Sequence, residues 1–189
     1  MSFARESVIE VLRKSSGLFS GSTSSRLVEM SEWTEFFLSQ VGASASLAGL
    51  LFVAMSINMK RIVAIPSLPS AALRALSLFV GDFVVSSVML IPGQTDLVLG
   101  SELLVSAAGV SIVICWLSFR VLRLSEQQYR GGSGLGLAAA LGVSSFYVAG
   151  ATFVLAGASI GPYLLVPPAL TSILLAVMDS WVLLVEINR

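Results

Sequence analysis

The sequence predicts an all-α fold, an integral membrane bundle of five transmembrane helices. Five long runs contain almost no charge, and each is about as long as the roughly 20 residues that a helix needs to cross a bilayer core. Of the 189 residues, 56% are hydrophobic and only 12% are charged, which is about half the charged share of a soluble domain. A soluble domain of this length could not bury so much apolar surface. The predicted spans are residues 36–59, 71–91, 103–122, 135–157 and 163–185.

Composition also narrows the chemistry. The chain has no histidine, which removes Ser-His-Asp triads, HExxH zinc sites and histidine proton relays. Its formal net charge of zero gives no indication of nucleic-acid binding. The single cysteine, Cys115, lies in an apolar run and cannot form an internal disulfide. We therefore expect no catalytic residues, cofactor, metal or nucleic-acid partner, and the lipid bilayer as the surroundings.

Residues 1–32 are predicted to form a separate N-terminal segment, flexible or amphipathic, before a transmembrane domain at residues 33–189. Its first part has a weak amphipathic pattern, and residues 15–25 are rich in serine and glycine, which is typical of a flexible linker. It is either a frayed tail or a helix lying on the membrane surface. A third interpretation is that Met30, just before the first span, is the true start.

Small residues mark the first and fourth predicted spans. The first contains an unbroken small-residue stretch around Gly42 to Gly49, and the fourth repeats Gly132, Gly136, Ala140 and Ser144 at four-residue spacing. Such ridges let membrane helices pack closely. They serve either packing within one chain or a homo-oligomer interface. In the fifth span, Pro167 and Pro168 indicate a helix start, with an internal kink as the alternative.

Basic residues concentrate on alternate predicted loops. Lys60 and Arg61 follow the first span, and Arg120, Arg123 and Arg130 follow the third. The loop after the second span is expected to hold Asp96 and Glu102 and no base. Because positively charged loops stay in the cytoplasm, the predicted orientation is N-out/C-in.

Asp82 is the most unusual residue of the sequence. It lies near the middle of the second span, where a charge costs at least about 2.5 to 3.5 kcal/mol. It must be protonated, paired with a cation or facing water. Arg74, two turns away on the same helix, is poorly placed to pair with it directly.

A second group of polar residues is expected in the inner half of the bundle. Ser172 and Asp179 are seven residues apart and share one face of the fifth span, and Gln40 and Asn58 share one face of the first. We expect Arg74 near Asp179 and Asn58. Three interpretations of this group are open. It is a structural ion pair that fixes helix register, a site that handles protons or ions, or a set of side chains that extend to the membrane interface.

An intramembrane aspartyl protease is the weakest hypothesis. Such enzymes need two carboxylates that share one proton. Gly81-Asp82 matches half of the GxGD pattern of presenilin-like and prepilin peptidases, but Phe79 replaces the first glycine. Asp82 and Asp179 are also expected at different depths.

The stretch from Trp33 to Gly93, about a third of the chain, resembles a known family. The stretches that carry the resemblance are Trp33-Thr34-Glu35-Phe36-Phe37, residues 42–58, Val84-Val85-Ser86-Ser87 and Leu90-Ile91-Pro92-Gly93-Gln94. They are similar to uncharacterised small bacterial multi-pass inner-membrane proteins of actinobacterial type, some labelled modulators of a membrane-bound AAA protease. The resemblance implies a bacterial inner membrane and supplies no catalytic residues.

Two functions follow as expectations. The first is a non-enzymatic membrane protein of interaction or regulatory type, binding a copy of itself or another membrane protein. The second is a small oligomeric channel or transporter that uses Asp82, Asp179 and Arg74. The candidate intramembrane polar residues are Asp82, Asp179, Arg74, Asn58 and Gln40.

Overall fold

The computed structural model describes residues 33–124 and 130–187. The segment at residues 1–32, predicted to be flexible or amphipathic, lies outside the described residues. The chain divides into two compact units, Met1–Phe36 and Phe37–Arg189. In the first unit, residues 33–36 begin a helix in which the Trp33 and Phe36 rings meet edge to face, with centroids 6.3 Å apart. The description below concerns the second unit.

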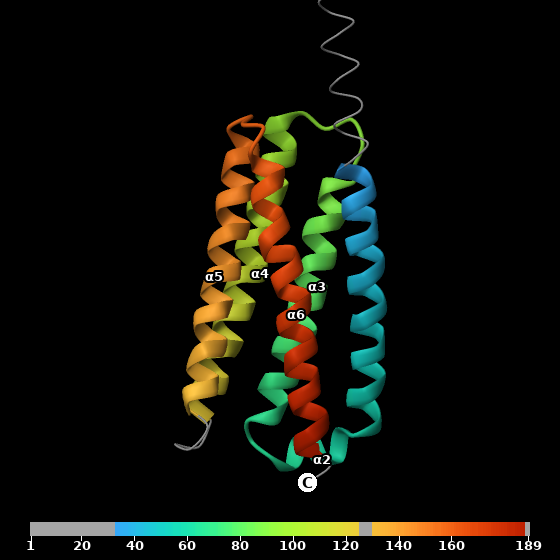
Figure 1. Ribbon diagram of the computed structural model, residues 1–189, viewed down its shortest axis with the longest axis vertical. Coiled ribbons are helices and arrows are strands. Elements are labelled where there is room, and N and C mark those ends of the chain that lie inside the picture. The colour runs from blue at the N-terminus through green and yellow to red at the C-terminus, as the bar shows by residue number, and fades with distance from the viewer. Residues whose placement is uncertain (1–32, 125–129, 188–189) are drawn as a thin grey trace, which may run out of the picture. The chain divides into compact units, whose positions relative to one another are not determined.

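Five long helices confirm the predicted fold class (Figure 1). They are the first helix (Trp33–Ile57), α3 (Leu68–Met89), α4 (Asp96–Leu124), α5 (Arg130–Leu155) and α6 (Gly161–Ile187), and the short α2 (Met59–Ala64) follows the first helix. In the described part of the chain, these five are long and apolar enough to cross a membrane. Large apolar side chains point outward from them, for example Ile57 and Val105 at 77% and 75% exposure, as expected of lipid-facing surfaces.

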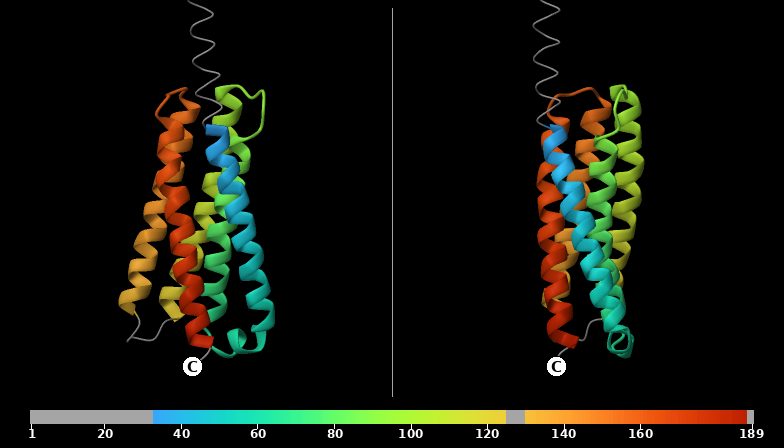
Figure 2. Two further views of the ribbon diagram at one scale, coloured as in Figure 1. Left: turned by 45° about the vertical axis from the view of Figure 1, so that its right-hand side comes forward. Right: turned by 90° about the vertical axis from the view of Figure 1, so that its right-hand side faces the viewer.

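Four of the helices form a ring. Helix α3 packs beside α4 and α6, and α5 packs beside the same two helices (Figures 1 and 2). From Phe37 onward the first helix adds to this ring through Leu51, which is buried with Phe79 of α3 and Ala176 of α6. Alanines at the centre, among them Ala75 and Ala140, let the helix backbones approach closely.

The two ends of the bundle differ in charge. The turns at residues 90–95 and 156–160 share one end, where Asp96 lies next to Gly157 and Gln94 donates a hydrogen bond to Glu102 at 2.5 Å. Gly93 and Gly157 make these turns with φ of 75° and 69°, a conformation that favours glycine. We call this the acidic end.

The opposite end, called here the basic end, carries α2 and the C-terminal ends of α4 and α6 (Figure 1). Lys60 and Arg61 are in α2. In the last turns of α4, Arg120 lies over the Trp116 ring at 5.4 Å and Arg123 over the Phe119 ring at 4.3 Å. Each arginine reaches an exposed aromatic ring four residues earlier on the same helix.

The charged residues that the sequence placed in loops are in helices instead, which is a correction. Helix α4 begins at Asp96 and includes Glu102, Arg120 and Arg123, whereas its span was predicted at residues 103–122. Acidic side chains are favourable in the first turn of a helix and basic ones in the last. The helix therefore extends past its apolar run at both ends.

The preferred interpretation of Pro167 and Pro168 as a helix start is also wrong. Helix α6 begins at Gly161 and contains both prolines in its interior. Because proline has no backbone N–H, neither residue can donate a hydrogen bond to the carbonyl four residues earlier. The segment from Gly161 to Val166 is apolar apart from its glycine and Tyr163, and it remains helical despite the prolines.

Candidate functional site

Arg74 and Asp179 form a bidentate ion pair between α3 and α6. The guanidinium donates from Nη2 to Oδ1 at 2.7 Å and from Nε to Oδ2 at 2.9 Å. The two side chains are only 10% and 19% exposed. This confirms the predicted proximity of Arg74 and Asp179. The fork geometry fixes both the distance and the rotation between the two helices.

Helix α5 closes over the same guanidinium. A Cβ placed on Gly136 would lie 2.8 Å from Arg74 Nη1, and this nitrogen is buried without a hydrogen-bond partner. Only a glycine leaves room for a guanidinium held in this position. The small-residue ridge of the fourth span therefore packs inside the chain, as the burial of Ala140 and Ser144 also indicates.

Asp82 lies at the centre of the bundle and has no exposed surface. The Tyr147 hydroxyl of α5 donates to its Oδ1 at 3.2 Å, and the same hydroxyl is 3.5 Å from Ser172 Oγ of α6. The other carboxyl oxygen, Oδ2, has no hydrogen-bond partner. Asp82, Tyr147 and Ser172 thus form a buried polar cluster contributed by three helices.

The first helix brings further polar groups towards this cluster. Ser44 is fully buried and lies close to the Asp82 carboxyl, although its hydroxyl donates to the Gln40 carbonyl at 2.6 Å. Gln40 is buried to 5% exposure, and its Nε2 finds no partner. One turn along α3 from Asp82, the Ser86 hydroxyl is also buried and unpartnered.

The two acidic residues belong to different levels of the bundle. Arg74 and Asp82 are eight residues apart on α3, about 12 Å along the axis, and Ser172 and Asp179 are about 10 Å apart on α6. Asp179 binds the arginine, whereas Asp82 binds a tyrosine. The carboxylates therefore do not share a proton as a protease dyad would.

Asn58, which is predicted to lie near this pair, makes its side-chain hydrogen bond with the last turn of the first helix. Its amide donates to the Ala54 carbonyl at 2.9 Å, and among the described residues no hydrogen bond joins it to Arg74 or Asp179. Asn58 instead occupies the N-cap position of α2, where the chain turns after the first helix.

Sequence reasoning missed Tyr147. A weak signal was available for Tyr147, because it is the single tyrosine in the middle of an apolar run and a buried tyrosine hydroxyl usually finds a partner. Nothing in the sequence indicates that the partner is Asp82, 65 residues away.

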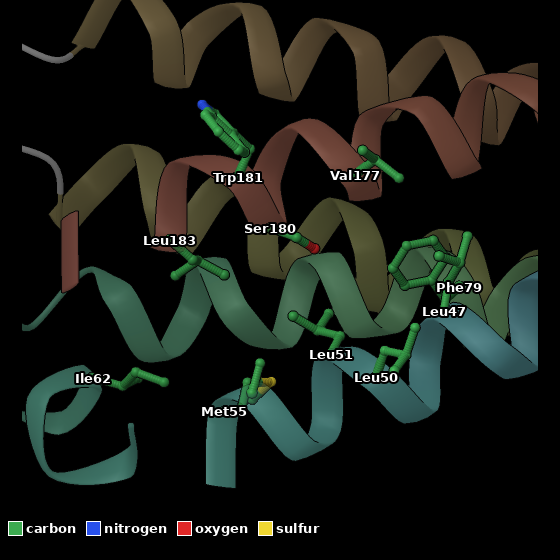
Figure 3. A pocket seen from close by; sticks show the side chains of 11 residues that line it. Leu47, Leu50, Leu51, Met55, Ile62, Phe79, Val177, Ser180, Trp181 and Leu183 are labelled. Carbon is green, nitrogen blue, oxygen red and sulfur yellow. The ribbon is translucent and has the colours of Figure 1, made fainter. Parts of the chain in front are cut away.

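An apolar cleft of about 360 Å³ lies between the first helix and α6. In Figure 3 it extends from Ile62 and Leu183, near the basic end, to Leu47 and Phe79. Phe79 precedes Asp82 by three residues on α3, and Leu47 follows Ser44 by three residues on the first helix. The inner end of the cleft is therefore about one turn from the buried carboxyl.

Chemically, the site offers one ion pair and one carboxyl among hydroxyl groups. In the described part of the chain, no group of three or more His, Cys, Asp or Glu side chains is arranged to hold a metal ion. Comparison with protein families gives no match. The curated proteins and the solved structures that were searched give none either.

Proposed function

We propose that this chain is a non-enzymatic membrane protein of interaction or regulatory type, which binds a second membrane helix from its own copy or from another membrane protein. The observation that carries the proposal is the outward face of the first helix. Gly42, Ala45 and Gly49 are exposed there, and a Cβ on either glycine would meet no atom within 4 Å.

Glycine on a lipid-facing helix surface weakens the helix and packs against nothing. Against another helix, the same residues allow a close approach of the two backbones. Gly136 of α5 packs on Arg74 inside the chain instead, although Gly142 of the same helix is as open as Gly42 and Gly49. The small residues of the first helix divide between Ser44, which faces inward, and this outward face.

We also propose a bacterial inner membrane as the location, with the orientation N-out/C-in. The resemblance to small bacterial inner-membrane proteins supports the location. The gathering of Lys60, Arg61, Arg120 and Arg123 at the end that carries the C-terminal end of α6 supports the orientation.

Cysteine crosslinking in native membranes tests the proposed interface. In a Cys115→Ala background, Ala45→Cys should crosslink efficiently through a bifunctional thiol reagent. Leu174→Cys is the matched control, because Leu174 is 66% exposed on α6 and the larger residues Leu170, Val177 and Met178 surround it on its helix. A product of two copies indicates self-association, and a product with another protein indicates a different partner. Crosslinking of Ala45→Cys no greater than that of Leu174→Cys would contradict the proposal.

A small oligomeric channel or transporter is the second candidate, favoured by Asp82. A carboxyl in the bilayer interior is costly and is typical of ion pathways, and one of its oxygens has no partner. Purified protein in liposomes should then show ion flux that Asp82→Asn reduces while assembly is unchanged. Absence of flux in the wild-type protein would contradict this candidate.

A further inference from the structure

The charges of the bundle interior do not balance around Asp82. Arg74 is already bound to Asp179 through two hydrogen bonds. The Asp82 carboxyl has no exposed surface, and the hydroxyl that donates to it, that of Tyr147, is neutral. An ionised Asp82 would be a buried charge without a counter-ion, which proteins avoid. The zero exposure of Asp82 separates it from bulk water, and the ion pair with Asp179 removes Arg74 as its counter-ion.

We propose that Asp82 is a reversible proton-binding site that exchanges its proton through the hydroxyl of Tyr147. The ion of the second candidate function, the channel or transporter, is then a proton. A role of Asp82 in transport rests on that candidate function. The proton is the ligand that fits a carboxyl of zero exposure, because it needs no coordination shell and no cavity. The unpartnered Oδ2 and the partnered Oδ1 give the carboxyl two chemically different oxygens.

The exchange is a relay along three oxygen atoms. A proton that arrives at Ser172 Oγ forms one O–H bond there, and the original Ser172 proton passes to Tyr147 Oη across 3.5 Å. The Tyr147 proton passes to Asp82 Oδ1 across 3.2 Å. The serine and the tyrosine each gain one proton and lose one, so the single net change is that Asp82 becomes neutral. The donor at Ser172 is a hydronium ion, which leaves as water, and the reverse sequence returns the proton from Ser172 Oγ to a water molecule.

Among the described residues, Asp82 is the one acidic residue at its level of the bundle. Helix α5 contributes Tyr147, α6 contributes Ser172 with Asp179 about two turns away, and α3 contributes Arg74, which Asp179 holds. Helix α4 carries Cys115, which contacts Ser144 at 3.6 Å. From Phe37 to Ile57 the first helix has no charged residue.

The apolar cleft of Figure 3 approaches the same carboxyl from the basic end. Leu47 and Phe79, whose side chain is 2% exposed, line its inner end. The polar level lies about one turn further along their helices. Leu47→Ala should therefore speed proton exchange at Asp82. Leu50→Ala, which changes an outward residue of the same cleft, is the control and should leave the exchange rate unchanged.

Infrared difference spectroscopy of the full-length protein in lipid bilayers tests the proposal. Titration from acid to alkaline pH should remove the carbonyl stretch of one buried protonated carboxyl. Asp82→Asn should abolish this band, Asp82→Glu should shift it, and Asp96→Asn, at the exposed acidic end, should leave it unchanged. If the band survives in Asp82→Asn, or if wild-type protein shows no such band at any pH, the proposal is wrong.

The tyrosine is tested by the rate of exchange after transfer from water to heavy water. Tyr147→Phe should retain the Asp82 band but slow its shift by about tenfold or more, because it removes the proton-transferring hydroxyl. Tyr163→Phe changes an exposed tyrosine and is the matched control. An unchanged rate in Tyr147→Phe would overturn the relay.

Flux measurements separate this proposal from the transport candidate. A titrating Asp82 band without proton flux in liposomes supports the proton site and contradicts transport. Flux that persists in Asp82→Asn supports transport and contradicts a role for the Asp82 proton in it.

Discussion

At the scale of single residues, the bidentate ion pair between Arg74 and Asp179 makes a direct prediction about stability. Asp179→Asn leaves a buried guanidinium without its counter-charge, so we expect the free energy of unfolding to fall by about 3 to 5 kcal/mol. Replacing both residues by leucine should restore most of that loss, because no unpaired charge remains. Unfolding in mixed micelles with increasing SDS measures both effects.

The control for this pair is Asp96→Asn, which changes an exposed carboxylate at the acidic end. This substitution should change the free energy of unfolding by less than about 1 kcal/mol. If Asp179→Asn proved no more destabilising than Asp96→Asn, the pair would have no structural weight. Its residues would then be better explained by a functional role.

Gly136 gives a second prediction for a single residue. Gly136→Ala should lower the free energy of unfolding by about 1 to 3 kcal/mol, because the added methyl group meets a guanidinium held by Asp179. Gly142→Ala on the same helix meets nothing within 4 Å and should be neutral or stabilising by up to about 1 kcal/mol. Equal effects of the two substitutions on SDS-induced unfolding would contradict the packing of Gly136 on Arg74.

The candidate residues were predictable where they violate the rules for a membrane span. Arg74, Asp82 and Asp179 are charged residues within or next to apolar runs, which is why their position in the sequence identified them. Their partners were harder to find, because a pairing depends on which helices are neighbours. The heptad spacing of Ser172 and Asp179 placed both on one inward face, but it could not show that one contacts Tyr147 and the other Arg74.

At the scale of the elements, α6 contains two prolines, which lack the backbone N–H that a helix needs. The same helix carries Ser172 and Asp179, which contact other helices in the interior. Pro167 is exposed and Pro168 is buried, and both precede Ser172 and Asp179. An interior proline costs a helix about 3 kcal/mol. Pro167→Ala should therefore raise the free energy of unfolding by about 1 kcal/mol or more, measured by SDS titration.

The outcome of Pro167→Ala also shows whether the proline is needed for packing. Lower stability in this variant would mean that the proline sets the path of α6 so that Asp179 can reach Arg74. The helix was predicted to begin at these prolines because interior prolines are rare in soluble helices. In a bilayer, neighbouring helices compensate for the missing hydrogen bonds more readily.

At the scale of the whole molecule, the number of spans followed directly from the length of the apolar runs. The ends of the helices did not, because Asp96, Arg120 and Arg123 are compatible with helix termini as well as with loops. Hydropathy detects the bilayer core, whereas a helix extends into the interface beyond it.

The orientation gives a prediction for the second unit as a whole. In a Cys115→Ala background, Gln94→Cys should react with a membrane-impermeant maleimide added to intact cells, because the acidic end is placed outside. Lys60→Cys, at the basic end, should react only after permeabilisation. The opposite pattern would reverse the proposed topology.

The central claim is that this bundle acts by binding another membrane helix through the outward face of its first helix. Native mass spectrometry of the full-length protein, extracted gently from its own membrane, tests it most directly. We expect a complex heavier than the 19.9 kDa chain, either a closed assembly of copies or one with a second protein, and its conversion to single chains by Gly49→Leu. A wild-type protein that is a single chain under these conditions, or a complex that Gly49→Leu leaves intact, would contradict the claim.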